Sequence, residues 1–282
     1  MIPIPIPVAR VQPWWSRWRP TLHYLMETEA HVYALAVAAS VLLAFYPFMV
    51  VMLSFCRDIL HWPDAIQAIY VGLRDFYAGE PGGFLVRNLQ PWMVPPLHLT
   101  SMFLLLFTAN GIFEPLEVAL NRAWGVTKNR SYLKNQMVSL GLIFACGGLA
   151  LLSLMLTAKN SGWVSGVSRA HTWLAGWIGP LAFKLAALPV SMLALFLVYW
   201  LLPNRPIEPR RVAPVAIVVG LVLEGLKYVN LLISPMLTAK LKHEYEPFQF
   251  SVTILLWSFA SAMVVLAGAH WTARRDKRDP LS

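Results

Sequence analysis

The stretch Val212–Ile233, VAPVAIVVGLVLEGLKYVNLLI, is 22 residues long and predominantly apolar. A helix rises 1.5 Å per residue, so about 20 apolar residues cross the roughly 30 Å hydrocarbon core of a bilayer. Backbone groups in lipid are satisfied only within helices or closed barrels. The stretch therefore predicts a membrane-spanning helix that carries an acid and a base, Glu224 and Lys227, near its middle.

Five further stretches have the same length and character, which predicts an all-α polytopic membrane protein with six transmembrane helices. They are Ala34–Cys56, His98–Leu120, Met137–Ala158, Gly176–Leu202 and Gln249–His270. The composition agrees, because 57% of the residues are hydrophobic, only 13% are charged and the mean hydropathy is +0.57. Soluble domains are about half apolar and a quarter charged. We expect a single membrane domain over residues 34–270, preceded by a tail at 1–33 and followed by a basic tail at 271–282.

The distribution of Lys and Arg predicts that both termini are cytoplasmic. The two tails and the loops Asn121–Gln136 and Pro203–Arg211 hold 14 of these residues, whereas the other three loops hold 7. Basic residues accumulate on the cytoplasmic side of membrane proteins. This bias also accounts for the formal charge of +9, so no nucleic-acid partner is inferred from it.

Two segments outside the spans have features of their own. The N-terminal tail has Trp14, Trp15 and Trp18 among arginines, which suits the headgroup layer, with a disordered tail as the alternative. The segment Arg57–Pro96 contains IQAIYVGLRDFY, whose apolar spacing predicts a short amphipathic helix on the outer side of the bundle. We expect this helix to break at GEPGGF, and a flexible loop is the alternative for the whole segment.

The span His98–Leu120 and its end carry a polar stripe. Asn110, Glu114, Glu117 and Asn121 are separated by four, three and four residues, which places them on one helical face. A carboxylate facing lipid costs several kcal/mol, so this face is expected to meet the bundle, water or a cation. Anchoring in the headgroup layer is the alternative for Glu117, and Glu114 precedes Pro115, which removes a helical hydrogen bond.

Glu224 and Lys227 form the second polar constellation. Their spacing of three residues places them on one face, where each lowers the cost of burying the other. Gly220, one turn earlier, leaves space for a neighbouring helix or a ligand. Ionisable residues inside a membrane are candidates for a substrate path, although an ion pair that fixes two helices has the same pattern. Tyr228 joins the candidates for the substrate path as the next residue on this helix.

The predicted cytoplasmic loops contain a third set, whose positive charges favour binding of anionic headgroups at the cytoplasmic leaflet. These candidates are Arg122, Lys128, Arg130, Arg205, Arg210 and Arg211. The alternative is that they only determine topology.

Patterns of catalytic and metal-binding residues are missing from the sequence. His243 and Glu244 begin HEYEP, but Pro247 occupies the place where a zinc protease needs its second histidine. No GxSxG, Walker or dinucleotide-binding sequence is present, and the two cysteines, Cys56 and Cys146, form no CxxC pair. We therefore expect no enzyme, no cofactor and no metal site.

Four stretches in fixed order resemble the BrkB/YihY family of bacterial inner-membrane proteins, once mislabelled ribonuclease BN. They are ALAVAASVLLAFYPFMV, GIFEPLEVALNRAWGV, YWLLPNRPIEPRRVAPVAIVVGLVLEGLKYVN and LLWSFASAMVVLAGAHWTARR. The resemblance covers about residues 34–275 and implies six transmembrane helices with cytoplasmic termini. It places Ala119–Asn121, Glu224 and Lys227 at characteristic positions. His270, where the family usually has Glu, and YEPFQF, in place of a Tyr-Gly turn, depart from the pattern.

These observations lead to a functional hypothesis for a multi-pass protein of the inner membrane. We expect it to transport or translocate a lipid or another amphiphilic or anionic small molecule through a partly polar cavity between the second and fifth spans. Glu224 and Lys227 would lie at the middle of this cavity, and Glu114 and Asn121 at its inner mouth. The alternatives are a non-transporting scaffold or assembly factor for envelope machinery and, more remotely, an enzyme acting on lipid. The expected partners are membrane lipids and their anionic headgroups, and a homo-oligomer is compatible with the sequence.

Overall fold

The structure is a computed structural model that describes residues 14–26, 28–77, 80–90, 99–126, 130–167, 188–245 and 248–278. Its described part is helical and contains no strand, which confirms the all-α fold class. The helices are α1 (Trp14–Met26), α2 (Thr28–Ser54), α3 (Pro63–Phe76), α4 (Glu80–Asn88), α5 (Leu99–Ala123), α6 (Tyr132–Val167), α8 (Pro209–Tyr245) and α9 (Gln249–Arg278). A further apolar helix covers Leu188–Leu201, and α2 continues into the π-helical turn Phe55–Ile59.

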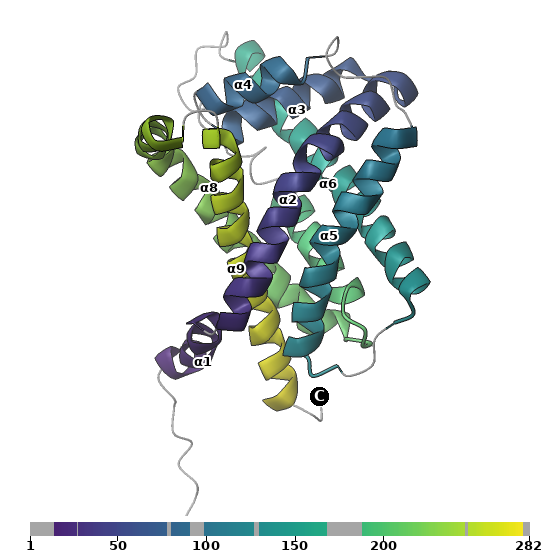
Figure 1. Ribbon diagram of the computed structural model, residues 1–282, viewed down its shortest axis with the longest axis vertical. Helices are drawn as coiled ribbons and strands as arrows, with labels where there is room; N and C mark the ends of the chain where they lie inside the picture. The colour runs from purple at the N-terminus through teal and green to yellow at the C-terminus, as the bar shows by residue number, and fades with distance from the viewer. Residues whose placement is uncertain are drawn as a thin grey trace, which may run out of the picture.

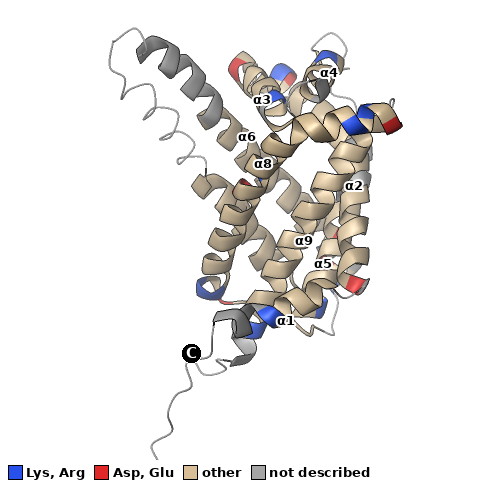
Figure 2. Ribbon diagram, turned by 90° about the vertical axis from the view of Figure 1, so that its left-hand side faces the viewer, with Lys and Arg blue, Asp and Glu red and all other residues tan. Residues whose placement is uncertain are grey.

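The long helices run between two ends of the bundle (Figure 1). One end carries α1 and the C-terminus and is called the terminal end; α3 and α4 cross the opposite end, called the α3 end. The helices α2, α5, α6, α8 and α9 connect the two ends. Most of the charged residues that can be followed along the ribbon in Figure 2 lie near these ends, and the middle of the bundle is mainly uncharged. This is the distribution that a bilayer around the middle requires.

Four helical stretches are long and apolar enough to cross a membrane. They are Glu29–Ile59, Leu133–Leu156, Pro209–Tyr245 and Gln249–Arg274, and each contains or overlaps a predicted span. The second predicted span lies in α5, a helix of 25 residues. Of the fourth predicted span, residues 188–202 are described and form mainly the shorter apolar helix, whereas 176–187 lie outside the described residues.

The segment between α2 and α5 contains the predicted amphipathic helix as α3. The break expected at GEPGGF is shorter than predicted. The chain leaves the helix at Tyr77, and Glu80 already begins α4, which contains Gly82 and Gly83 of this motif. Gly82 packs so closely on the end of α3 that a Cβ atom would collide with the Tyr77 carbonyl. The hydroxyl of Tyr70 donates to the Leu89 carbonyl at 2.6 Å, which ties α4 to α3. These contacts hold a helix where glycine and proline favour a loop.

The N-terminal segment is helical over residues 14–26, so a disordered tail does not describe this part; residues 1–13 lie outside the described residues. The helix α1 packs on α9. The ring of Tyr24 stacks on His270, with 4.5 Å between centroids and 4° between planes. His270 Nδ1 also lies 3.4 Å from Thr21 Oγ1. The described part of α9 extends to Arg278, within the stretch expected to be a tail.

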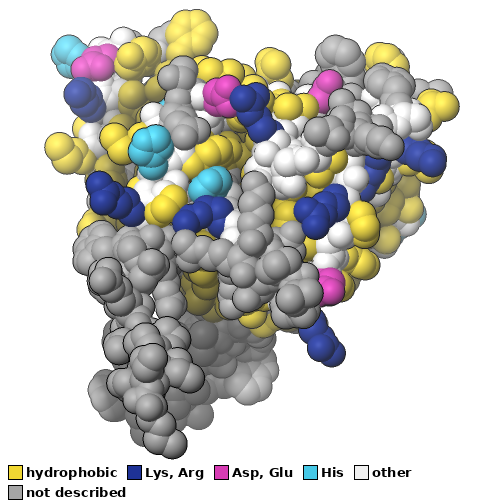
Figure 3. Space-filling model, turned by 90° about the horizontal axis from the view of Figure 1, so that it is seen from below, with side chains coloured by type: hydrophobic (Ala, Val, Ile, Leu, Met, Phe, Trp, Pro, Cys, Tyr) yellow, Lys and Arg dark blue, Asp and Glu magenta, His cyan; other side chains and the backbone are white. Residues whose placement is uncertain are grey.

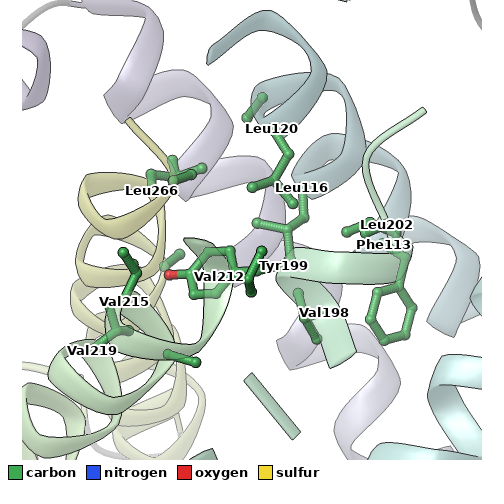
Figure 4. Packing of buried hydrophobic residues seen from close by; sticks show 14 of the residues in the cluster. Phe113, Leu116, Leu120, Val198, Tyr199, Leu202, Val212, Val215, Val219 and Leu266 are labelled. Carbon is green, nitrogen blue, oxygen red and sulfur yellow. The ribbon is translucent and has the colours of Figure 1, made fainter. Parts of the chain in front are cut away.

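Buried apolar residues form two clusters. The larger one fills the terminal half of the bundle with side chains from α2, α5, α6, α8, α9 and the helix Leu188–Leu201. Figure 4 shows its centre, where Tyr199 lies between valines of α8 and leucines of α5 and α9. Tyr199 donates a hydrogen bond to the Val265 carbonyl at 2.7 Å. The smaller cluster lies at the α3 end and joins α2 and α6 to α3 and α4.

Candidate functional site

A cavity of about 940 Å³ lies in the half of the bundle nearer the α3 end, and it is partly open to the surroundings. Its wall comes from α2, α3, α6, α8, α9 and the helix Leu188–Leu201, and most of the wall is apolar. The polar side chains that line it are Arg74, Tyr77, Ser153, Ser191, Glu224, Lys227, Tyr228, Asn230 and Ser261. An apolar pocket with a few convergent polar groups is the usual form of a small-molecule site.

Glu224 and Lys227 line this cavity together with Tyr228. The Lys227 ammonium lies 3.9 Å from Oε1 of Glu224, and the two side chains are 34% and 29% exposed. A tight ammonium–carboxylate hydrogen bond measures about 2.7–2.9 Å, so the two charges attract each other without closing a short contact. Each group keeps hydrogen-bonding capacity for a third partner. The predicted pairing of the two residues on one face is therefore present and lies in the wall of a cavity.

Gly220 has the role that its position predicted. A Cβ atom on Gly220 would lie 2.8 Å from the Met192 side chain, so the absence of a side chain lets the helix Leu188–Leu201 approach α8. The residue also lines the cavity. The free space is thus used by a neighbouring helix at the edge of the site.

The wall formed by α3 was not predicted as part of a site, because the sequence marks this segment only as amphipathic. Arg74 and Tyr77 contribute a cation and a hydroxyl to the cavity. Burial raises the pKa of the Tyr77 hydroxyl, so this group stays protonated and available as a donor. Asn230 of α8 donates to the Phe76 carbonyl at 2.8 Å and fixes the end of α3 against the cavity. The sequence of an amphipathic helix does not show that the helix lines a cavity.

The cavity and the large apolar cluster follow each other along the same helices. On α8 the buried residues Val212, Val215 and Val219 precede the lining residues, which begin at Gly220. On the helix Leu188–Leu201 the order is reversed, with the lining residues before Tyr199. These two helices therefore run in opposite directions between the cavity and the cluster. The packed cluster therefore separates the cavity from the terminal end.

The polar stripe of α5 does not belong to this cavity. None of the described α5 side chains lines it, so the expectation that Glu114 and Asn121 form its inner mouth is not met by the geometry. Glu114 is exposed on the bundle surface, and the side chain of Asn110 lies outside the described residues. The helices α3 and α6 and the helix Leu188–Leu201 face α8 across the cavity instead. Hydrophobic periodicity identifies the polar face of a helix, but it does not identify the neighbouring helix that this face contacts.

Glu117 and Asn121 are both buried, each 5% exposed, and they form a separate polar contact near the terminal end. Asn121 Nδ2 donates to Glu117 Oε1 at 3.4 Å, and Asn121 Oδ1 accepts a hydrogen bond from the backbone N–H of Asn204 at 2.8 Å. Asn204 belongs to the loop between the helix Leu188–Leu201 and α8. This contact, called here the α5 polar contact, fixes that loop to α5.

The basic candidates gather near the terminal end, where Figure 3 shows Lys and Arg side chains spread over the face. Several of them make contacts within the chain. Arg122 pairs with Glu29 at 2.6 Å, Arg211 pairs with Glu208 at 3.2 Å, and Arg205 lies 5.9 Å from the ring centroid of Trp124.

Arg130 has a structural role in this set. Its guanidinium donates to the carbonyls of Leu201 and Pro203, at 3.0 and 2.7 Å, and so clamps the loop that follows the helix Leu188–Leu201. Arg210 is exposed, and Lys128 lies outside the described residues. Most of these cations therefore organise the chain, whether or not they also contact headgroups.

Comparison with known proteins agrees with these features. The family model described as Virulence factor BrkB matches residues 21–281. A UPF0761 membrane protein of Pseudoalteromonas translucida (strain TAC 125) is 27% identical over 173 residues, which are 57% of this chain and 52% of that protein. The chain thus matches about half the length of this relative. No solved structure matches the chain. Because the family model covers nearly the whole sequence, including all of the described helices from α2 to α9, the chain belongs to the BrkB family.

Proposed function

We propose that the protein translocates a lipid, or another amphiphilic or anionic small molecule, in the bacterial inner membrane. One observation supports this most directly: a loosely paired acid and base, Glu224 and Lys227, line an apolar cavity of about 940 Å³ in a membrane protein. An apolar wall suits acyl chains, and the charged pair suits a polar headgroup. With Arg74 the cavity holds two cations and one anion, which favours a ligand with net negative charge.

The proposed arrangement in the membrane has six spans with both termini in the cytoplasm. Under this topology the cavity lies in the outer half of the bilayer, and the large apolar cluster seals it from the cytoplasm. Translocation then requires a second conformation in which this cluster opens toward the inner leaflet. The partners of this proposal are membrane lipids, with anionic headgroups at the cytoplasmic arginines. It involves no catalysis, no cofactor and no nucleic acid, and it is compatible with a monomer or a homo-oligomer.

The test compares two double variants of α8 in liposomes that carry a fluorescent anionic phospholipid. Glu224→Gln with Lys227→Met removes the charged pair from the cavity. Lys240→Met with Glu244→Gln removes one base and one acid from exposed positions of the same helix. Hydrogen bonds to charged groups contribute about 1.5–3 kcal/mol, so the cavity variant should lose about tenfold or more in translocation rate. The control variant should keep the wild-type rate.

The scaffold alternative gives a different result in the same experiment. A scaffold would show no lipid movement above that of empty liposomes even for the wild-type protein, and the cavity variant would still restore the envelope phenotype of a deletion strain. This outcome would overturn the proposal. A folded cavity variant with full translocation would also contradict it, because the charged pair would then have no part in the reaction.

A further inference from the structure

Unsatisfied polar atoms gather near the terminal end of the bundle, away from the cavity. Seven buried side-chain nitrogen and oxygen atoms of the described residues have no hydrogen-bond partner. Five of them belong to Glu117, Asn135, Ser139 and Asn204. Asn135 and Ser139 lie near the start of α6, which packs on α5, and Asn204 is joined to Glu117 through Asn121. Buried polar groups are almost always satisfied, so each such atom needs an explanation.

Glu117 is the group whose burial is hardest to explain without a ligand. Its side chain is 5% exposed, its Oε1 accepts one long hydrogen bond of 3.4 Å from Asn121, and its Oε2 has no partner. Burying a carboxylate without a counter-charge costs several kcal/mol. A buried water molecule would complete the hydrogen bonds but would leave the negative charge uncompensated.

The cations near Glu117 do not neutralise it. Arg122 pairs with Glu29, Arg130 donates to two backbone carbonyls, and Arg205 lies over Trp124. The elements packed on this part of α5 also bring other charged or titratable side chains to the terminal end: His31, Tyr33, Lys134, Glu208, His270 and Arg274. Within the described part of the chain, none of these groups forms an ion pair with Glu117. Among the residues that the structure describes, the carboxylate therefore has no counter-ion.

We propose that Glu117, together with Asn204, binds a sodium ion. The free atoms are mainly oxygens: Oε2 of Glu117, Oδ1 of Asn204, Oδ1 of Asn135 and the hydroxyl of Ser139. Hard cations prefer such ligands. A single carboxylate balances one positive charge, whereas divalent ions are usually held by several carboxylates, so a monovalent ion fits this site.

The site is distinct from the cavity and lies within the packed half of the bundle. Leu116 and Leu120, which flank Glu117 on α5, and Leu202, two residues before Asn204, all belong to the large apolar cluster. The bound cation thus stabilises the contact between α5 and the loop after the helix Leu188–Leu201. This inference does not depend on translocation and holds equally for a protein with another function.

The experiment uses the full-length protein in lipid nanodiscs and measures thermal unfolding in sodium or choline chloride at constant ionic strength. The matched pair is Glu117→Gln and Glu114→Gln, since Glu114 is an exposed carboxylate one turn earlier on the same helix. Saturating sodium should raise the midpoint by about 5 °C for the wild type and for Glu114→Gln. Glu117→Gln should show no rise.

The second arm observes the carboxylate directly. Infrared spectra of protein with isotope-labelled glutamate should show a carboxylate band that shifts on addition of sodium in the wild type and in Glu114→Gln. This shift should be absent in Glu117→Gln, whose neutral amide should support wild-type stability without sodium. Asn204→Ala keeps the carboxyl group and should weaken the sodium response, which keeps the test decisive if Glu117→Gln does not fold. A wild-type protein whose unfolding midpoint and carboxylate band do not respond to sodium would overturn the proposal.

Discussion

At the scale of single residues, Gly268 shows how closely α9 approaches its neighbours. A Cβ atom at this position would collide with Val219 of α8 and would lie 2.6 Å from the Tyr199 hydroxyl. Replacing Gly268 by Ala should therefore force these side chains apart. We expect a loss of about 1–3 kcal/mol in the free energy of unfolding, the usual cost of overpacking a core. Chemical unfolding in detergent micelles measures this change.

Gly148 provides the matched control for that substitution. It lies within α6 and is exposed, and a Cβ atom there would meet nothing within 4 Å. Gly148→Ala should stabilise the protein by about 0.5–1 kcal/mol, because alanine favours a helix over glycine. Opposite signs for the two substitutions are the expected result. Equal effects would mean that α9 does not pack against Tyr199 and Val219 as closely as the structure has it.

Two glutamates in apolar helices show what a sequence reveals at this scale. The spacing of Glu224 and Lys227 predicts that the two side chains meet, and they do. Glu117 has an equally clear signal, because it shares a helical face with Asn121, and those two side chains also meet. The local sequence does not determine what surrounds each glutamate, however. Glu224 faces a cavity, whereas Glu117 is covered by a packed loop whose residues are far away in the chain.

At the scale of helices, the contact between α1 and α9 depends on His270. Its ring stacks on Tyr24, and its Nδ1 lies near the Thr21 hydroxyl. His270→Ala should remove both contacts and loosen α1 without unfolding the bundle. We expect about a tenfold faster hydrogen exchange of the backbone amides in residues 14–26, which corresponds to the loss of about 1.4 kcal/mol of local stability.

The control for the α1 prediction is His243→Ala. His243 is an exposed histidine at the other end of the bundle, on α8, and its loss should leave the exchange of α1 unchanged. Unchanged exchange in His270→Ala would show that other contacts of α1 with α2 and α9 hold it in place. The same measurement covers residues 99–123 as an internal reference, and these should not change in either variant.

The short helices at the α3 end mark where helix prediction from periodicity stops. The spacing of Ile66, Ile69, Tyr70 and Leu73 identifies α3 because a packed face needs apolar residues at these intervals. In α4 the sequence EPGGF contains residues that disfavour helices, yet the structure has a helix. Contacts with α3 decide the outcome, and these contacts are not visible in the local sequence.

At the scale of the whole molecule, the two halves of the bundle differ in packing. Composition and length predict an all-helical membrane bundle, because few other structures satisfy the backbone in lipid. They do not predict that the terminal half is solid and the other half hollow. That difference arises from α3, which lies across the end of the bundle and forms one wall of the cavity. The sequence of a short amphipathic helix does not show which other helices it packs against.

The proposed topology predicts that the two ends of α8 lie on opposite sides of the membrane. Single cysteines at Arg210 and Lys240, in a background with Cys56→Ala and Cys146→Ala, report on these ends. Both positions are exposed. A membrane-impermeant maleimide added to spheroplasts should label Lys240→Cys, because the proposed topology, based on the excess of basic residues, has the terminal end in the cytoplasm. Arg210→Cys should react only after the membrane is permeabilised.

The outcomes of this labelling are distinct because both cysteines lie on one continuous helix. The 30 residues between them correspond to about 45 Å, enough to cross the hydrocarbon core of about 30 Å. Labelling of Arg210→Cys alone in intact spheroplasts would invert the topology and would place the cavity in the inner half of the bilayer. Labelling of both would mean that α8 does not cross the membrane. Only labelling of Lys240→Cys alone is consistent with a cavity that is open in the outer half and sealed from the cytoplasm.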